Sequence, residues 1–370
     1  MLIVPVDGSS FAHTDRRGAH GVGSIGSHRS GGRGLKLMSA YALTYDGVPL
    51  GVGAHVFWAR PLVPNPTPHT HRSLDDKESR WWTLLQIRFE ETLRDEGADA
   101  RPWYQLDREA DASHVLMRGV KPGAWVTVRS HYDRLLEAKS GHRAHRRLHQ
   151  TISESPILGV VHVWVSRTRG RELRVARLEL RVADVELKLR ELWSHRQLAN
   201  VAVTAVEARE VDTCPAGETP IAWLLLTTFP TKTLDDAVRV VRAYSLRWAI
   251  ERLHFTWKSG TCQVEQSQLE SSHALRKWAT VQLSVAAHRQ HALQLSRTQP
   301  DLPSDEVFER EQIDAALTLF SEHRQDAPRP GSIPSLGTLV EIIARLGGYA
   351  GKSSGGPPGI ATFGLSLIHI

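Results

Sequence analysis

Apolar and polar positions alternate most clearly in the middle of the chain. Leu178, Leu180 and Val182 alternate with charged residues, and the same pattern follows in residues 184–190. A period of two is typical of half-buried strands. Shorter apolar runs predict further strands at residues 2–7, 36–45, 50–58, 103–107, 124–130 and 223–228. The Asp46–Gly47 pair predicts that 36–45 and 50–58 form a hairpin.

Longer segments with helical spacing separate these strands. They predict helices at residues 75–96, 108–118, 234–258, 269–295, 305–323 and 335–346. Gly97 is expected to close the first of them, and Ser304 and Ser335 are expected N-caps of the last two. The tail from residue 347 is rich in Gly, Pro and Ser, which predicts disorder up to an apolar end at 365–370.

The order of the elements is three strands, a helix, a strand, a helix and a strand, with an acidic helix much later. This order is expected of an α/β fold with a ribonuclease-H-like catalytic core that carries an insertion. We therefore expect core segments at 1–130 and 223–295, a β-rich insertion at 131–222, and a small helical C-terminal region with a disordered tail at 296–370.

Composition narrows the class of protein. The 370 residues carry a net charge of +6, and the pI of about 9.5 favours polyanionic partners. Cys214 and Cys262 are too few for a disulfide framework or a metal cluster, which fits a reducing cytosol. No apolar stretch approaches the roughly 20 residues that span a bilayer, and the start has no basic leader. We expect a cytoplasmic protein without a membrane partner.

The first candidate site lies in residues 244–258, which contain no Pro or Gly and predict one helix. On a straight helix Tyr244, Arg247, Glu251 and Lys258 fall within an arc of roughly 60°. A carboxylate between two cations and a phenol suits a hard metal ion beside phosphates. The alternative is a solvated face of mixed charge, which is common on exposed helices.

Two other patterns have simpler explanations. Residues 21–26 read as a GxGxxG sequence, but no strand leads into it and no helical pattern follows, so we expect a loop. The His residues among Arg143, Arg146 and Arg147 allow either a metal site or a basic loop that faces phosphate. The absence of Cys or clustered acids favours the basic loop; the histidines are His142, His145 and His149.

The spacing Tyr-x2-Arg-x3-Glu-x6-Lys resembles the signature of the insertion-sequence-four family of DDE transposases, which includes the transposon-five type. Asp7, which ends the apolar run of residues 2–6, resembles the first acid of that family. Asp107, followed by Arg-Glu-Ala-Asp, resembles the second acid, and Glu251 would be the third. Glu109 and Asp111 compete with Asp107 on composition alone, but the strand-end position favours Asp107.

The resemblance implies roles for these residues. Asp7, Asp107 and Glu251 would be the catalytic acids and would bind two Mg²⁺ or Mn²⁺ ions. Tyr244, Arg247 and Lys258 would contact phosphates of the transposon end. The remaining two implied DNA contacts are Trp223, which would hold a base turned out of the duplex, and Arg129, which would face the same strand.

The implied function is metal-dependent cleavage at transposon ends followed by strand transfer. The partners would be double-stranded transposon-end and target DNA and a second copy of the chain in a synaptic complex, in a bacterial cytoplasm at the nucleoid. Asp7 lies six residues from the start, whereas family members carry an N-terminal DNA-recognition domain before this acid. The alternatives are a truncated, catalytically poor remnant that binds DNA or dimerises and inhibits an intact copy, and a host-adapted nuclease of the same fold.

Overall fold

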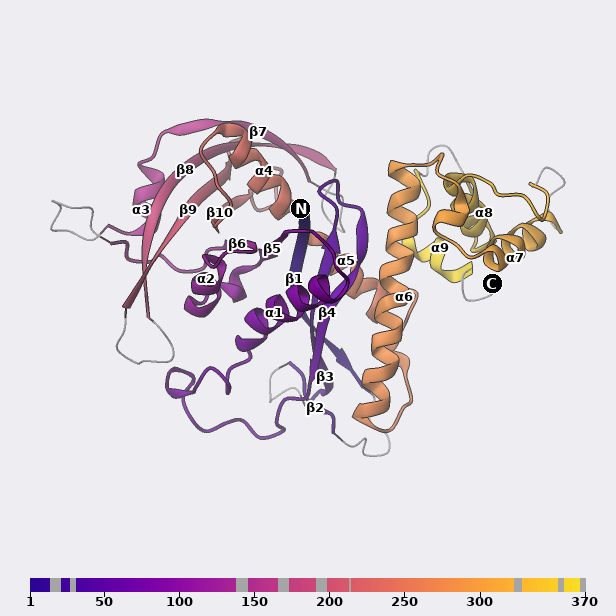
Figure 1. Ribbon diagram of the computed structural model, residues 1–370, viewed down its shortest axis with the longest axis horizontal. Helices are drawn as coiled ribbons and strands as arrows, with labels where there is room; N and C mark the ends of the chain where they lie inside the picture. The colour runs from indigo at the N-terminus through magenta and orange to yellow at the C-terminus, as the bar shows by residue number, and fades with distance from the viewer. Residues whose placement is uncertain are drawn as a thin grey trace. The chain divides into compact units, whose positions relative to one another are not determined.

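The computed structural model describes residues 1–370 (Figure 1) apart from nine segments. These are residues 14–20, 27–30, 138–145, 166–172, 191–197, 213, 323–327, 352–355 and 367–370. The predicted basic loop around His142, Arg143 and His145 therefore lies outside the described residues, as does the end of the apolar C-terminus.

The chain divides into two compact units. The first comprises Met1–Asp7, Met38–Ala40 and Asn65–Trp248. The second comprises Gly8–Leu37, Tyr41–Pro64 and Ala249–Ile370. Three elements contribute residues to both units: strands β1 (Leu2–Ala12) and β3 (Arg33–Leu43) and helix α5 (Trp248–Lys258).

The first unit is built on a mixed sheet with the strand order β3-β1-β5-β6-β10-β9-β8-β7. Strands β1, β5 and β6 run parallel, and β10, β9, β8 and β7 continue the sheet in antiparallel pairs. The bounds are β5 (Pro102–Leu106), β6 (Trp125–Arg129), β7 (Ile157–Val165), β8 (Arg174–Arg190), β9 (Leu198–Glu210) and β10 (Ala222–Thr227). The predicted α/β class is confirmed.

Helices cover both faces of the parallel strands (Figure 1). On one face the Tyr104 hydroxyl of β5 donates to the Gln86 carbonyl of α1 (Arg80–Asp95) at 3.0 Å, and α2 (Ser113–Gly119) packs on Val126. Trp103 points to the opposite face and stacks on Phe229 with ring centroids 4.2 Å apart. Helix α4 (Leu234–Ser245) lies on that second face. The core of this unit is therefore two apolar layers, one on each side of the sheet.

The expected strands and helices of the first unit are found with shifted bounds. Residues 108–118 are not one helix but a short 3₁₀ turn, η3 (Arg108–Ala110), followed by α2. The two alternating stretches within 177–190 belong to the single strand β8. Between β6 and β7 the chain forms α3 (Leu148–Ser153), and a further 3₁₀ turn, η2 (His69–His71), precedes α1.

The predicted continuous helix through residues 244–258 is wrong. Helix α4 ends at Ser245 and α5 begins at Trp248, with Leu246 and Arg247 in a turn between them. The Arg247 amide donates to the Tyr244 carbonyl at 3.0 Å, a bond over three residues that tightens the backbone. Tyr244 and Arg247 therefore belong to the first unit, and Glu251 and Lys258 project from a separate helix. The arc expected for one straight helix does not apply.

In the second unit, β2 (Gly23–Ser24) and β4 (Pro49–Trp58) pair with β3. The predicted hairpin is confirmed, since the Thr44 amide donates to the Val48 carbonyl at 2.9 Å and Gly47 adopts a φ of 85°. The long helix α6 (Ser272–Thr298) follows the short turn η4 (Val264–Gln266) and packs on β4, where His55 Nε2 lies 3.0 Å from Thr280 Oγ1.

Three C-terminal helices pack with the end of α6 around an apolar cluster. They are α7 (Arg310–Ser321), α8 (Leu336–Leu346) and α9 (Ile360–Ser366). Ser335 caps α8 as predicted, whereas Ser304 lies in the 3₁₀ turn η5 (Ser304–Glu306) and α7 is capped by Glu309. The expected disordered tail is wrong for residues 360–366, because they form α9 and bury Phe363 completely. No helix among the described residues is long and apolar enough to span a membrane.

We expect Phe363→Ala to destabilise the C-terminal cluster by about 3–5 kcal/mol, because it removes a fully buried ring. Amide hydrogen exchange should speed up in α8 and α9. The exposed neighbour Ala361 provides the control, since Ala361→Ser should change stability by no more than about 0.5 kcal/mol. Equal exchange in the two variants would contradict the packing of α9.

His254, which is buried within α5, should make the second unit sensitive to acid. Burial, with a smaller contribution from Lys258, lowers the pKa of His254 to about 3. The unfolded chain, with a His pKa near 6.5, therefore binds the proton first, so stability falls as the pH drops below about 6.5. At pH 4.5 protonation of His254 in the unfolded chain should lower the free energy of unfolding by about 2–3 kcal/mol. Urea unfolding at several pH values should show a smaller loss of stability in acid for His254→Gln than for the unaltered chain. If stability fell equally with pH in both proteins, His254 would not be the source of the acid sensitivity.

Candidate functional site

Three of the predicted site residues lie side by side where the parallel pairing of β1, β5 and β6 ends. Pro5 pairs with Gln105, and Leu106 pairs with Val128. Extending the first register by two residues puts Asp7 opposite Asp107, and extending the second by one puts Asp107 opposite Arg129. Paired residues of neighbouring strands lie about 4.8 Å apart and point to the same face. We call Asp7, Asp107 and Arg129 the strand-end row.

Strand β10 brings Trp223 to the same face. Leu225 pairs with Arg129, and Trp223 lies two residues away, so its side chain points to the side of the strand-end row. The Trp223 ring meets the Tyr244 ring edge to face, with centroids 5.3 Å apart. Trp223 is half-buried, and Tyr244 is only 3% exposed. Tyr244 of α4 therefore packs against Trp223, the tryptophan predicted to hold a base.

Arg247 reaches the row from the turn that follows α4. Its Nη1 donates to Oδ2 of Asp7 at 3.1 Å, with both side chains largely shielded from water. The Asp7 carboxylate, in the middle of β1, is thus neutralised by a guanidinium from the other end of the unit's sequence. This contact joins two residues that the sequence separates by 240 positions.

The charged groups of the strand-end row and Arg247 influence the pKa of Tyr244. Burial raises the pKa of the Tyr244 phenol, the charges of Arg247 and Arg129 oppose that rise, and Asp107 adds to it. Burial also lowers the pKa of Arg129, whose Nη2 donates to the Ala222 carbonyl at 3.0 Å. The phenol is therefore neutral at ordinary pH and lies among two guanidinium groups and one carboxylate.

Asp107 is half-buried at the end of β5. It follows β5 directly with an extended backbone and caps η3, where Oδ1 accepts the Glu109 amide at 2.8 Å. Glu109 itself is exposed and lies within η3. The capping bond fixes the direction of the Asp107 side chain at the strand end, because an N-cap carboxylate is held by the first free amides of a helix.

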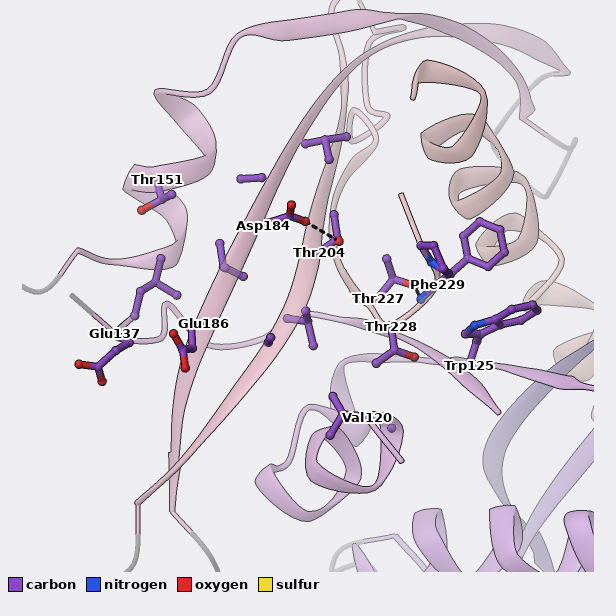
Figure 2. Close-up of a pocket in the computed structure, with 18 of the residues that line it drawn as sticks. Val120, Trp125, Glu137, Thr151, Asp184, Glu186, Thr204, Thr227, Thr228 and Phe229 are labelled. Carbon is purple, nitrogen blue, oxygen red and sulfur yellow. Dashed lines mark hydrogen bonds between the residues drawn. The ribbon is translucent and has the colours of Figure 1, made fainter. Parts of the chain in front are cut away.

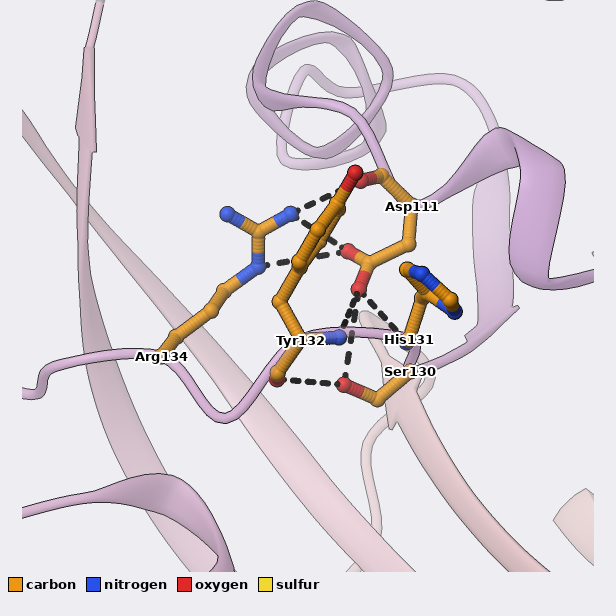
Figure 3. Close-up of polar contacts among 5 residues, drawn as sticks. All are labelled: Asp111, Ser130, His131, Tyr132 and Arg134. Atoms are coloured by element: carbon orange, nitrogen blue, oxygen red, sulfur yellow. Dashed lines mark hydrogen bonds and ion pairs between the residues drawn. The ribbon is translucent and has the colours of Figure 1, made fainter.

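Asp111 has a different role (Figure 3). Its Oδ2 accepts the amides of His131 at 2.7 Å and Tyr132 at 3.1 Å, and its Oδ1 accepts Arg134 Nη2 at 2.6 Å. The carboxylate is fully buried, and the Ser130 hydroxyl also approaches it. All its accepting positions are directed at protein donors, so Asp111 holds the loop after β6 in place.

The remaining two predicted residues lie in the second unit. Glu251 is half-buried in the first turn of α5, and Lys258, in its last turn, places Nζ 3.8 Å from Glu265 Oε1. The strand-end row and α5 belong to different units, so the proposed meeting of Glu251 with Asp7 and Asp107 stays a prediction. Among the described residues no group of three or more His, Cys, Asp or Glu side chains is arranged to hold a metal ion.

The first unit also contains a cavity of about 1680 Å³ that the sequence did not predict (Figure 2). It lies beyond Trp125 at the start of β6, the opposite end of that strand from Arg129. Strands β8 and β9 form one wall, where Thr204 Oγ1 donates to Asp184 Oδ1 at 2.8 Å. One sequence feature coincides with this cavity. The apolar positions of β8 change from even to odd numbers between Val182 and Val185, and this part of β8 lines the cavity.

Comparison with known proteins adds one finding. Residues 285–370 match the family model of the transposase Tn5 dimerisation domain. The matched segment contains the C-terminal part of α6 and helices α7, α8 and α9, which share the apolar cluster described above. The match supports the formation of homodimers, and it supports a Tn5-type transposase family for this chain.

Proposed function

We propose that the chain is a DDE transposase of the insertion-sequence-four family that cuts DNA at transposon ends and transfers the cut strand to target DNA. The observation that carries this proposal is the strand-end row, in which Asp7 and Asp107 lie side by side on parallel strands. The match of residues 285–370 to a Tn5 transposase dimerisation domain supports a transposase of the Tn5 type. The order of the strands in the first unit, with helices on both faces, supports a ribonuclease-H-like core.

The residues present fit a hard divalent cation. Mg²⁺ keeps several of its waters and is usually held by one or two carboxylates and the phosphates of the substrate. Asp7 and Asp107 supply two such carboxylates, and we propose Glu251 as the third ligand of a site for two Mg²⁺ or Mn²⁺ ions. When bound, these ions neutralise charge on the attacking and leaving oxygens of the phosphodiester.

The protein's own side chains would bind and orient the DNA. Arg247 now neutralises Asp7, and a phosphate near the turn offers its guanidinium an alternative partner. Arg129 and the neutral Tyr244 phenol would donate to the same strand. The half-buried Trp223 ring, supported by Tyr244, would stack on a base turned out of the duplex. Lys258 would contact phosphate from α5.

Asp111 supports the assignment of Asp107 as the second acid. Of the three acids in residues 107–111, Asp111 is committed to the loop after β6, and Glu109 lies on an exposed turn. Asp107 is the acid in line with Asp7 on the paired strands. We propose a dimer that acts on double-stranded DNA in a bacterial cytoplasm, where the nucleoid supplies transposon ends and targets.

The direct test is cleavage of labelled fragments from the two ends of the DNA element that encodes the chain. We expect nicking in Mg²⁺ or Mn²⁺, none with a chelator, and none by Glu251→Gln at unchanged folding stability. A folded protein that binds the fragments as a dimer and never cuts would favour the alternative, a catalytically poor remnant. Undiminished cutting by Glu251→Gln would contradict the proposed third acid.

A further inference from the structure

An exposed pair of aromatic side chains follows the strand-end row directly. β6 ends at Arg129, and His131 and Tyr132 come two and three residues later, both on the surface. Tyr132 is 55% exposed, and the centroids of the two rings lie 4.7 Å apart in an edge-to-face arrangement. A solvent-exposed aromatic ring held in a fixed position is typical of surfaces that bind flat ligands.

The backbone beneath these rings is fixed. The buried carboxylate of Asp111 accepts the amides of both His131 and Tyr132, and the Ser130 hydroxyl donates to the Tyr132 carbonyl at 3.1 Å (Figure 3). The ion pair with Arg134 fixes the other side of the loop. A rigid ring loses less conformational entropy on binding than a mobile one, so the arrangement is suited to a contact.

Two arginines lie near the ring, and each is paired with a carboxylate, Arg134 with Asp111 and Arg147 with Asp133. The Arg134 guanidinium lies 5.2 Å from the centroid of the Tyr132 ring. Arg147 forms an isolated antiparallel β-bridge with Leu135; its side chain is 59% exposed, and its Nη1 donates to the Asp133 carbonyl at 3.0 Å. Arginine beside an exposed aromatic ring is the combination that binds an unpaired nucleotide, with stacking on the base and charge for the phosphate.

We propose that Tyr132, presented by the loop Ser130–Arg134, stacks on an unpaired base of the bound DNA. Tyr132 would act beside Trp223 of β10, since the Ser130 amide donates to the carbonyl of Leu224, the next residue after Trp223, at 2.7 Å. The proposal rests on DNA as the ligand of the proposed function and adds a second stacking position to it. Arg147 would contact the phosphate next to that base.

The test measures DNA binding by the full chain with fluorescence anisotropy. Two probes are compared: a blunt duplex, and the same duplex with a short unpaired extension. We expect Tyr132→Ala to weaken binding of the extended probe about tenfold and to leave the blunt duplex within about twofold, which is the size of one lost stacking contact. Tyr132→Phe should retain the affinity, because the ring stacks without its hydroxyl.

Two controls separate the outcomes. Trp164, 71% exposed on β7, provides the matched aromatic, and Trp164→Ala should bind both probes normally. Equal binding of the extended probe by Tyr132→Ala and the unaltered chain overturns the inference and leaves the proposed function standing. Loss of dimer in Tyr132→Ala without a change in DNA binding also overturns it, in favour of a protein contact. If the unaltered chain binds neither probe, the proposed function fails as well.

Discussion

Asp107→Asn should reduce cleavage of transposon-end DNA by about 10³-fold or more, because it removes one of two carboxylates that a divalent cation needs at the strand ends. Asparagine keeps the oxygen that accepts the Glu109 amide, so the N-cap of η3 survives. Folding stability should therefore change by no more than about 1 kcal/mol. The measurement is single-turnover cleavage of a labelled end fragment, together with a thermal unfolding curve for each protein.

Glu109→Gln is the matched control for this prediction. Glu109 lies two residues further on, carries the same charge, and is exposed. Its replacement should leave the cleavage rate within a few-fold of the unaltered chain. If Glu109→Gln abolished cleavage and Asp107→Asn did not, the assignment of the second acid would be wrong, and with it the strand-end row as the catalytic centre.

The second large effect concerns folding. Asp111→Asn should destabilise the first unit by about 3–5 kcal/mol, because it leaves the Arg134 guanidinium without the buried charge that balances it. The loop after β6 should also lose order, since Oδ2 of Asp111 holds two of its amides. Urea unfolding gives the free energy, and hydrogen exchange of the His131 and Tyr132 amides gives the local effect.

Asp133→Asn is the control, because Asp133 pairs with Arg147 on the surface at 3.8 Å. Such pairs contribute about 0–1 kcal/mol. The double variant Asp111→Asn with Arg134→Met should recover part of the lost stability, since it removes the unbalanced charge. Similar losses in Asp111→Asn and Asp133→Asn would show that the buried carboxylate does not hold the loop.

Local sequence patterns were sufficient for most elements of the fold. The alternation in residues 177–190 and the Asp46–Gly47 turn predicted β8 and the hairpin, because strand period and turn chemistry are set by neighbouring residues. The position of Asp107 at the end of an apolar run also predicted its place in the strand-end row. Its pairing partners, Asp7 and Arg129, follow from the parallel register of three strands.

The features that sequence reasoning missed depend on distant contacts. No Pro or Gly marks the break at Leu246–Arg247; there Arg247 turns to meet Asp7, 240 residues away. The Gly-rich tail reads as disordered, yet Phe363 has a buried site among α6, α7 and α8. Position at the end of a strand was enough to prefer Asp107 over Asp111 as the second acid. The role of Asp111 depends on a contact with the loop after β6, which lies 20 residues further along the chain.

The central claim is that Asp7, Asp107 and Glu251 bind the same divalent cations. Fe²⁺ that occupies such a site reduces added hydrogen peroxide, is oxidised to Fe³⁺, and releases hydroxyl radicals that cut the polypeptide close to the metal; the fragments can be mapped by mass spectrometry. We predict cuts near residues 7, 107 and 251 that excess Mg²⁺ suppresses and that Asp107→Asn removes at all three places together. Cuts confined to one of these positions, or located elsewhere in the chain, would contradict a shared metal site.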